Sequence, residues 1–120
     1  MRIFVEDTFS ASHYLRDYKG KCESPHGHNF KVRVEVEGEV KENGMVMDFE
    51  DLKKILKEIL SLLDHKDLNS IPPFLEKNPT CEHIAEFLMQ KLEEKLPSGI
   101  RPVLVMVEEK PGQGAIYERR

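Results

Sequence analysis

The chain has 120 residues, which is enough for one domain built around a single core. Its net charge of -4 and the lack of a basic cluster in the sequence argue against direct nucleic-acid binding. No apolar run approaches the ~20 residues of a membrane helix, and the first residues lack the apolar stretch of a signal peptide. We therefore expect a soluble, cytoplasmic protein in which both cysteines are reduced thiols.

Two segments near the N-terminus alternate apolar and polar residues, over 2–13 and over 30–37. This period of two predicts half-buried strands. His13 falls on the apolar face of the first strand. The same parity, extended backward from the second strand, places His26 and His28 on its apolar face.

The remainder of the chain predicts two helices and further short strands. Asp48 and Thr80 precede runs of apolar residues at helical spacing, as N-caps do. Two helices that cover one face of an antiparallel sheet make a single α+β sandwich, and this is the fold class that we predict. The predicted elements after residue 40 are a turn at 41–44, a short strand at 45–47, a helix from about 49 to 63, a helix from Thr80 to Leu96, a strand at 103–109 and a short strand at 115–118.

The three histidines are the strongest candidates for a metal site. In a strand, the His26-Gly27-His28 spacing separates the two Cα atoms by about 6.6 Å, so both imidazoles can reach one ion. His13 can complete the set from the neighbouring strand. Three neutral imidazoles suit zinc, and three ligands leave a coordination position open, as in catalytic sites. If Cys22 were a fourth ligand, the site would be closed and structural, and each histidine could also simply be hydrogen-bonded in the core.

Four other positions are candidates for catalysis or binding. Asp64 beside His65 could orient a base, although a histidine is also favoured at a helix C-terminus by the dipole. Glu109 continues the core-facing parity of the valine-rich strand and requires a partner there. Cys22, in the loop before the histidines, is a candidate base or a packing residue, and Cys81 is expected to be a packing residue.

Taken in order, these residues resemble the motifs of the 6-pyruvoyl-tetrahydropterin synthase family, which includes the 6-carboxy-tetrahydropterin synthases. The resemblance covers the chain from end to end. It implies the tunnelling fold, a four-stranded antiparallel sheet with two helices packed on one face. In that family the sheets of a trimer close into a barrel, two trimers form a hexamer, and active sites lie between subunits. The matching segments are His13, Cys22-x-x-x-His26-Gly27-His28-Asn29-Phe30, Met47-Asp48-Phe49, Leu63-Asp64-His65, Asn78-Pro79-Thr80-x-Glu82 and Val105-x-Val107-x-Glu109.

The resemblance also implies an activity, that of a zinc-dependent lyase that eliminates triphosphate from dihydroneopterin triphosphate. It further implies a homohexamer without a nucleic-acid or membrane partner, and Lys31, Arg33 and Glu35 would line its barrel. The implied roles are zinc ligation by His13, His26 and His28, proton abstraction by Cys22 with Asp64 and His65 as relay partners, recognition of the pterin by Glu109, and seating of the pterin by Thr80 and Glu82.

The loop before His26 bears on the product. Three residues separate Cys22 from His26, as in the 6-carboxy-tetrahydropterin synthases, which lose acetaldehyde with triphosphate and serve deazaguanine (queuosine or archaeosine) biosynthesis. Glu23 makes a Glu-x-x-His-Gly-His pattern, which resembles a subtype that cleaves the side chain to a 6-hydroxymethyl pterin for folate synthesis. We rank the carboxy product first, then the hydroxymethyl product or both, then the pyruvoyl product. A non-catalytic pterin-binding module and a structural zinc domain remain alternatives of other classes.

Overall fold

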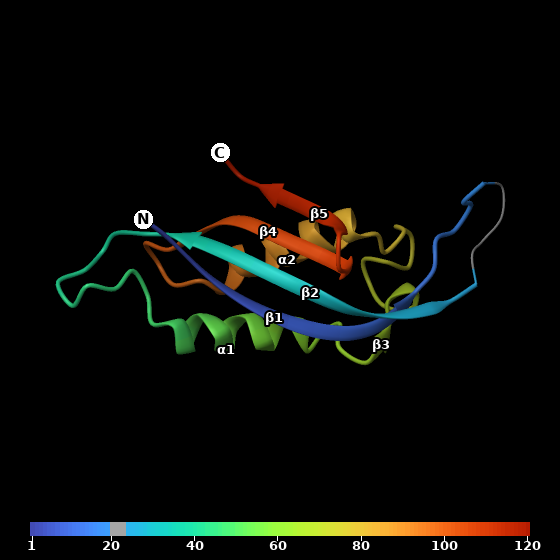
Figure 1. The fold of residues 1–120 in the computed structure, drawn as a ribbon, viewed down its shortest axis with the longest axis horizontal. Helices are drawn as coiled ribbons and strands as arrows, with labels where there is room; N and C mark the ends of the chain where they lie inside the picture. The colour runs from blue at the N-terminus through green and yellow to red at the C-terminus, as the bar shows by residue number, and fades with distance from the viewer. Residues whose placement is uncertain (20–23) are drawn as a thin grey trace.

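The computed structural model describes residues 1–19 and 24–120. A sheet forms one layer of the molecule (Figure 1). β1 (Arg2–His13) pairs antiparallel with β2 (His26–Glu37), β2 with β4 (Arg101–Lys110), and β4 with β5 (Gln113–Glu118). A two-residue strand, β3 (Lys66–Asp67), adds parallel to β1, which gives the order β3-β1-β2-β4-β5. The four antiparallel strands confirm the predicted sheet, and β3 is an addition too short to leave an alternating pattern.

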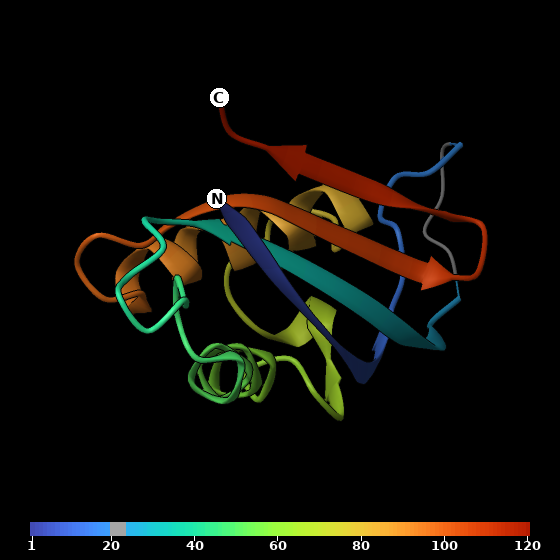
Figure 2. The same cartoon turned by 60° about the vertical axis from the view of Figure 1, so that its left-hand side comes forward.

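Both helices pack on the same face of the sheet, which confirms the predicted α+β sandwich (Figures 1 and 2). The helices are α1 (Phe49–Leu60) and α2 (Cys81–Lys95), with a 3-10 turn η1 (Leu68–Ser70) between them. Asp48 Oδ1 accepts a hydrogen bond from the Glu50 N–H at 2.8 Å, and Thr80 Oγ1 accepts one from the His83 N–H at 3.1 Å, so both predicted caps are confirmed. No helix in the described part of the chain has the length and apolar character needed to cross a membrane.

The first helix is shorter than its apolar spacing predicts. It ends at Leu60, and the chain then tightens into turns in which the Leu63 N–H donates to the Leu60 carbonyl at 2.9 Å. Leu63 is nevertheless fully buried. The apolar spacing therefore continues into a turn that still faces the core, which is why it overestimates the length of the helix by three residues.

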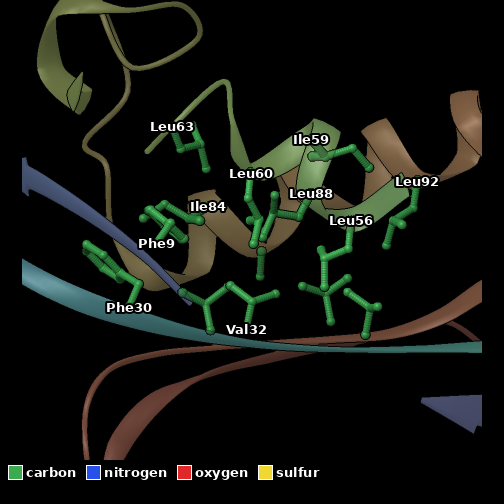
Figure 3. Close-up of a cluster of buried hydrophobic side chains, with 14 of the residues drawn as sticks. Phe9, Phe30, Val32, Leu56, Ile59, Leu60, Leu63, Ile84, Leu88 and Leu92 are labelled. Carbon is green, nitrogen blue, oxygen red and sulfur yellow. The ribbon is translucent and has the colours of Figure 1, made fainter. Parts of the chain in front are cut away.

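The core lies between the sheet and the helices (Figure 3). Phe30 and the valines that follow it on the same face of β2 have no exposed surface, as the period of two predicted. Phe9 of β1 stacks on Phe30, with ring centroids 4.8 Å apart and planes 7° from parallel. The helices contribute leucines and isoleucines to this core, among them Leu56, Ile59, Ile84, Leu88 and Leu92.

The predicted strand at 45–47 is wrong. These residues lie in a loop that is closed by hydrogen bonds from the Lys41 N–H to the Met45 carbonyl and from the Gly44 N–H to the Lys41 carbonyl. A strand that returned along β2 would need a free edge there, but β1 and β4 already occupy both edges of β2. The apolar character of the segment instead reflects the burial of Val46.

The other face of the sheet carries a network of charged side chains. Arg33 contacts Glu35 at 3.0 Å and Glu6 at 3.3 Å, and Lys31 contacts Glu6 at 3.6 Å. The guanidinium of Arg33 also lies 3.6 Å from the ring centroid of Phe4, which is half exposed. The charges on this face are therefore paired within the protomer, and an apolar ring lies exposed among them.

Candidate functional site

The structure brings the three histidines together at the end of β1 and the start of β2, beside the loop that joins these strands. In the strand register His13 lies opposite His26, and Ala11 lies opposite His28. The ligand nitrogens of the three rings all lie within 4.8 Å of one another. Nitrogens bound to one tetrahedral zinc ion at ~2.0–2.1 Å lie about 3.4 Å apart, so small side-chain rotations would let all three bind one ion.

Hydrogen bonds orient two of the rings toward a common point. His13 Nδ1 lies 2.8 Å from the Pro79 carbonyl oxygen, and His26 Nδ1 lies 3.1 Å from the Ser24 carbonyl oxygen. Because a carbonyl can only accept, each Nδ1 carries the proton and each Nε2 presents a lone pair. Nε2 of His13 is buried and has no hydrogen-bond partner among the described residues. A metal ion would satisfy this buried lone pair, so the residues fit the group that the sequence implies.

The protonation state of His28 also suits metal binding. Burial lowers the pKa of His28, and the neighbouring imidazoles of His13 and His26 lower it further, whereas Glu109 opposes the shift. The ring is therefore neutral at physiological pH. Since a histidine binds a metal in its neutral form, few protons compete for this ligand near neutrality.

A cleft of about 360 Å³ opens beside His13 and His26, within the range of about 300–1,000 Å³ for small-molecule sites. The predicted pterin-binding residues Thr80, Glu82 and Glu109 line it. The Thr80 hydroxyl also caps α2, and Glu82 is exposed in the first turn of that helix. The residues predicted to bind pterin therefore share one cleft with two of the predicted metal ligands, His13 and His26, although they come from strands and a helix far apart in sequence.

The predicted relay pair lies elsewhere on the protomer. Asp64 Oδ1 accepts a hydrogen bond from the Ser10 N–H at 2.8 Å, and Asp64 Oδ2 lies 3.0 Å from His65 Nδ1. The hydrogen bond from Ser10, with help from His65, lowers the pKa of Asp64. The His65 side chain is 82% exposed and lines a second cleft of about 470 Å³, which His28 also lines. Within one protomer, the structure does not bring this pair into the cleft of Glu109.

The two candidate bases, Cys22 and Glu23, lie outside the described residues. Cys81 lies at the start of α2 and is buried, as expected for a packing residue. Burial, together with the nearby carboxylates of Glu109 and Glu82, raises the pKa of its thiol to about 11. Cys81 is therefore a neutral thiol at physiological pH and a poor nucleophile.

Two asparagines, neither of them predicted from the sequence to have a role in the site, hold the chain as it leaves His13. Asn69 accepts from the Tyr14 N–H at 2.9 Å and donates to the Tyr14 carbonyl at 3.1 Å. Asn78 accepts from the Arg16 N–H at 2.8 Å and donates to the Arg16 carbonyl at 3.1 Å. Each side-chain amide thus pairs with both the backbone N–H and the backbone carbonyl of one residue, as the backbone of a neighbouring strand would. Asparagines are mostly exposed, and no local sequence pattern marked Asn69 as buried or Asn78 as part-buried.

Replacing Asn69 with alanine should destabilise the fold by about 2 kcal/mol, because it leaves two part-buried backbone groups of Tyr14 without their partner. Urea unfolding followed by circular dichroism measures this loss. Asn43, whose side chain accepts one hydrogen bond in an exposed turn, is the matched control, and its replacement should cost about 0.5 kcal/mol. Equal losses in the two variants would contradict a clamping role for Asn69.

Comparison with known proteins places the chain in a family. The family described as 6-pyruvoyl tetrahydropterin synthase matches residues 2–120. A protein of Archaeoglobus fulgidus, provisionally named 6-carboxy-5,6,7,8-tetrahydropterin synthase, is 47% identical over 95 residues, which cover 79% of this chain and 78% of the relative. Dihydroneopterin monophosphate aldolase of Pyrococcus furiosus is 38% identical over 100 residues, which cover 83% of this chain and 82% of the relative.

A solved structure agrees with the sequence comparison. The 6-pyruvoyl tetrahydropterin synthase of Caenorhabditis elegans superposes with a TM-score of 0.84 at 29% identity, covering 100% of this chain and 96% of that one. The fold and the family expected from the motifs are both confirmed. The chain belongs to the 6-pyruvoyl tetrahydropterin synthase family of lyases, and it is an enzyme that acts on pterin intermediates.

Proposed function

We propose that the chain is a zinc-dependent lyase that converts dihydroneopterin triphosphate and one water molecule to 6-carboxy-tetrahydropterin, triphosphate and acetaldehyde. The observation that carries this proposal is the cluster of three histidines beside the Glu109 carboxylate, two of which, His13 and His26, line the same cleft as Glu109. His13, His26 and His28 would hold the ion through Nε2. A zinc ion held there would supply Lewis acidity to the hydroxyl groups of the substrate side chain.

The carboxylate of Glu109 supports recognition of a pterin. The amino-pyrimidine edge of a pterin presents two N–H donors side by side, and the two oxygens of a carboxylate can accept both. Glu109 is only part-buried, with 24% of its side chain exposed, so a ligand in the cleft can reach it. Thr80 and Glu82 line the same cleft and would border the seated ring.

The proton chemistry would fall to Cys22, with Asp64 and His65 as its relay partners. The Asp64 carboxylate is ionised because its pKa is lowered, and it can therefore orient His65 through the contact at 3.0 Å. The His65 ring points outward from its own protomer, where it is available to a site that forms between subunits. This placement supports an oligomeric enzyme, and we propose a cytoplasmic homohexamer.

The edges of the sheet support the same assembly. β5 is the last strand of the order, and β1 is paired on its outer side by β3 only at Ala11 and Ser12. Open strand edges favour pairing with another chain. Pairing of β5 with β1 of the next subunit would close three sheets into a barrel lined by the charged face of Lys31, Arg33 and Glu35.

The choice of the 6-carboxy product rests on two observations. Three residues separate Cys22 from His26, which is the spacing of the 6-carboxy enzymes. The Archaeoglobus relative carries that name at 47% identity. On this basis we place the product in deazaguanine biosynthesis for queuosine or archaeosine.

A second candidate is cleavage of the pterin side chain to a 6-hydroxymethyl pterin. Glu23 precedes His26 with the spacing of that subtype, and the Pyrococcus relative at 38% identity is named as an aldolase acting on dihydroneopterin monophosphate. The two activities would use different bases in the same loop. Formation of a 6-pyruvoyl product, for which the Caenorhabditis structure is named, is the third candidate.

Product analysis tests these alternatives directly. The zinc-loaded full chain is incubated with dihydroneopterin triphosphate and, separately, with dihydroneopterin monophosphate, and the products are identified by mass. We expect 6-carboxy-tetrahydropterin, triphosphate and acetaldehyde from the triphosphate. A hydroxymethyl or pyruvoyl product would select the corresponding alternative, and no turnover of either substrate at full zinc loading would contradict an enzymatic role in this step.

Two variants identify the base. Cys22→Ala should abolish formation of the carboxy product, whereas Glu23→Ala should leave it nearly unchanged. The opposite result would favour the hydroxymethyl activity. If neither variant changes the rate, neither residue is the base, whereas binding of a pterin without any turnover would describe a pterin-binding module. Unfolding on removal of zinc by a chelator would instead indicate a structural metal.

A further inference from the structure

The two oxygens of the Glu109 carboxylate face different partners. Oε1 accepts a hydrogen bond from Gln113 Nε2 at 2.6 Å. Oε2 lies 3.7 Å from His13 Nε2 and 3.9 Å from His28 Nε2. One oxygen is thus held by a neutral amide, while the other approaches two of the nitrogens that would bind zinc.

This geometry brings Glu109 close to the position of a fourth ligand. Ligand atoms around a tetrahedral zinc ion are about 3.4 Å apart, and carboxylate oxygens bind zinc at about 2.0–2.2 Å. Oε2 exceeds that separation by only a few tenths of an ångström toward His13 and His28. A small shift of the carboxylate would therefore complete four-coordination, which is the arrangement of a structural site rather than a catalytic one.

A β-bulge gives Glu109 the freedom to make this shift. Between β4 and β5, Glu108 lies opposite Gly114 and Lys110 lies opposite Gln113, so Glu109 is the extra residue. A bulged residue leaves the regular ladder and its side chain is re-aimed. Any side chain at Gly114 would collide with the backbone of Val107 and Glu108, so the glycine permits the close approach of the two strands at the bulge.

From these contacts we infer that Gln113 is a positioning residue that keeps Glu109 from closing the metal site. The inference rests on the proposed function, in which the same carboxylate must receive the N–H groups of the pterin. A carboxylate bound to zinc would have lost the oxygen needed for one of these hydrogen bonds and would occupy the open coordination position. The side-chain amide of Gln113, on the opposing strand β5, donates a hydrogen bond to Oε1. This bond restrains the carboxylate so that Oε2 stays off the metal and remains available to the substrate.

Gln113→Leu tests this role, because leucine has similar volume and no donor. We expect the variant to bind zinc about tenfold more tightly, on the scale of about 10–100-fold by which groups around a metal site alter its affinity. Affinity is measured by competition with a chromophoric chelator. The visible spectrum of the cobalt-substituted protein reports the added ligand, and KM for dihydroneopterin triphosphate should rise more than kcat falls, since the substrate must displace the carboxylate.

The double variant Glu109→Gln/Gln113→Leu separates this mechanism from a general change in the fold. A neutral amide is a poor zinc ligand, so the gain in affinity and the change in the cobalt spectrum should both disappear. Gln90→Leu, at an exposed position on α2, is the matched control and should behave like the unaltered chain. The melting temperature and the circular dichroism spectrum of each variant are measured as well, and only variants that match the unaltered chain in both are compared.

Two results would overturn the inference, and the first of them leaves the proposed function intact. The first is an unchanged zinc affinity and cobalt spectrum in Gln113→Leu. The second is a loss of zinc affinity in Glu109→Gln alone, which would show that Glu109 already binds the metal in the unaltered chain despite Gln113. Failure of the unaltered chain to bind zinc or cobalt would overturn the proposed function and this inference with it.

Discussion

Replacing His26 with alanine should abolish turnover and leave the fold intact. His26 is an exposed residue of β2, and its Nδ1 donates a hydrogen bond to the carbonyl of Ser24, two residues away. Removing the His26 ring therefore removes little packing. Loss of an outer partner of a metal ligand already reduces affinity or activity by about 10–100-fold, and loss of a ligand itself should exceed this. We therefore expect a decrease of more than about 100-fold in kcat/KM for dihydroneopterin triphosphate.

The measurement combines kinetics with the zinc content of the purified chain and with its melting temperature. His83→Ala is the matched control, because His83 is a part-exposed histidine whose Nδ1 contacts the Asn78 carbonyl outside the histidine cluster. It should retain zinc and turnover. A His26→Ala protein that is fully loaded and active would contradict metal ligation by this residue. His13 is less suitable for the test because it is buried, and its replacement would also disturb packing.

Replacing Leu88 with alanine should strongly destabilise the fold. Leu88 lies on the face of α2 that packs against the sheet, and it has no exposed surface (Figure 3). Removing a buried leucine side chain costs about 2–5 kcal/mol, because apolar contacts are lost and a cavity remains. Since domains of this size are stable by about 5–15 kcal/mol, the variant should lose a large fraction of its free energy of unfolding.

Urea unfolding with a linear extrapolation gives the change in free energy. Leu62→Ala is the matched control, because the Leu62 side chain, in the turn after α1, is 44% exposed. Its replacement should change stability by less than about 0.5 kcal/mol. Similar losses in the two variants would contradict the placement of the core between α2 and the sheet.

The faces of the strands could be predicted because side chains alternate with a strict period of two. That period put Phe30 and the valines of β2 in the core, and it put His13, His26 and His28 on the same side as the core. The structure adds the register, in which His13 lies opposite His26. Register depends on the pairing of segments separated by a loop, and alternation within each strand leaves it undetermined.

Capping residues predicted where the helices begin, but apolar spacing did not predict every strand. Asp48 and Thr80 cap their helices because their side chains satisfy backbone N–H groups within three residues. The segment at 45–47 was wrongly predicted as a strand, since its apolar residues did not reveal that both edges of β2 were taken. Occupancy of a sheet edge is a property of the whole sheet.

The sequence by itself therefore determined the fold class, the faces of the long strands and the candidate metal site of three histidines, because these depend on residue types at short, regular spacings. Only the tertiary structure decided how distant segments meet. It placed Glu109 on a bulge beside His13, paired it with Gln113 across the β4–β5 turn, and set Asp64 and His65 against the edge of β1 at Ser10. These contacts join residues between 4 and 96 positions apart, and no local period or propensity encodes such a distance.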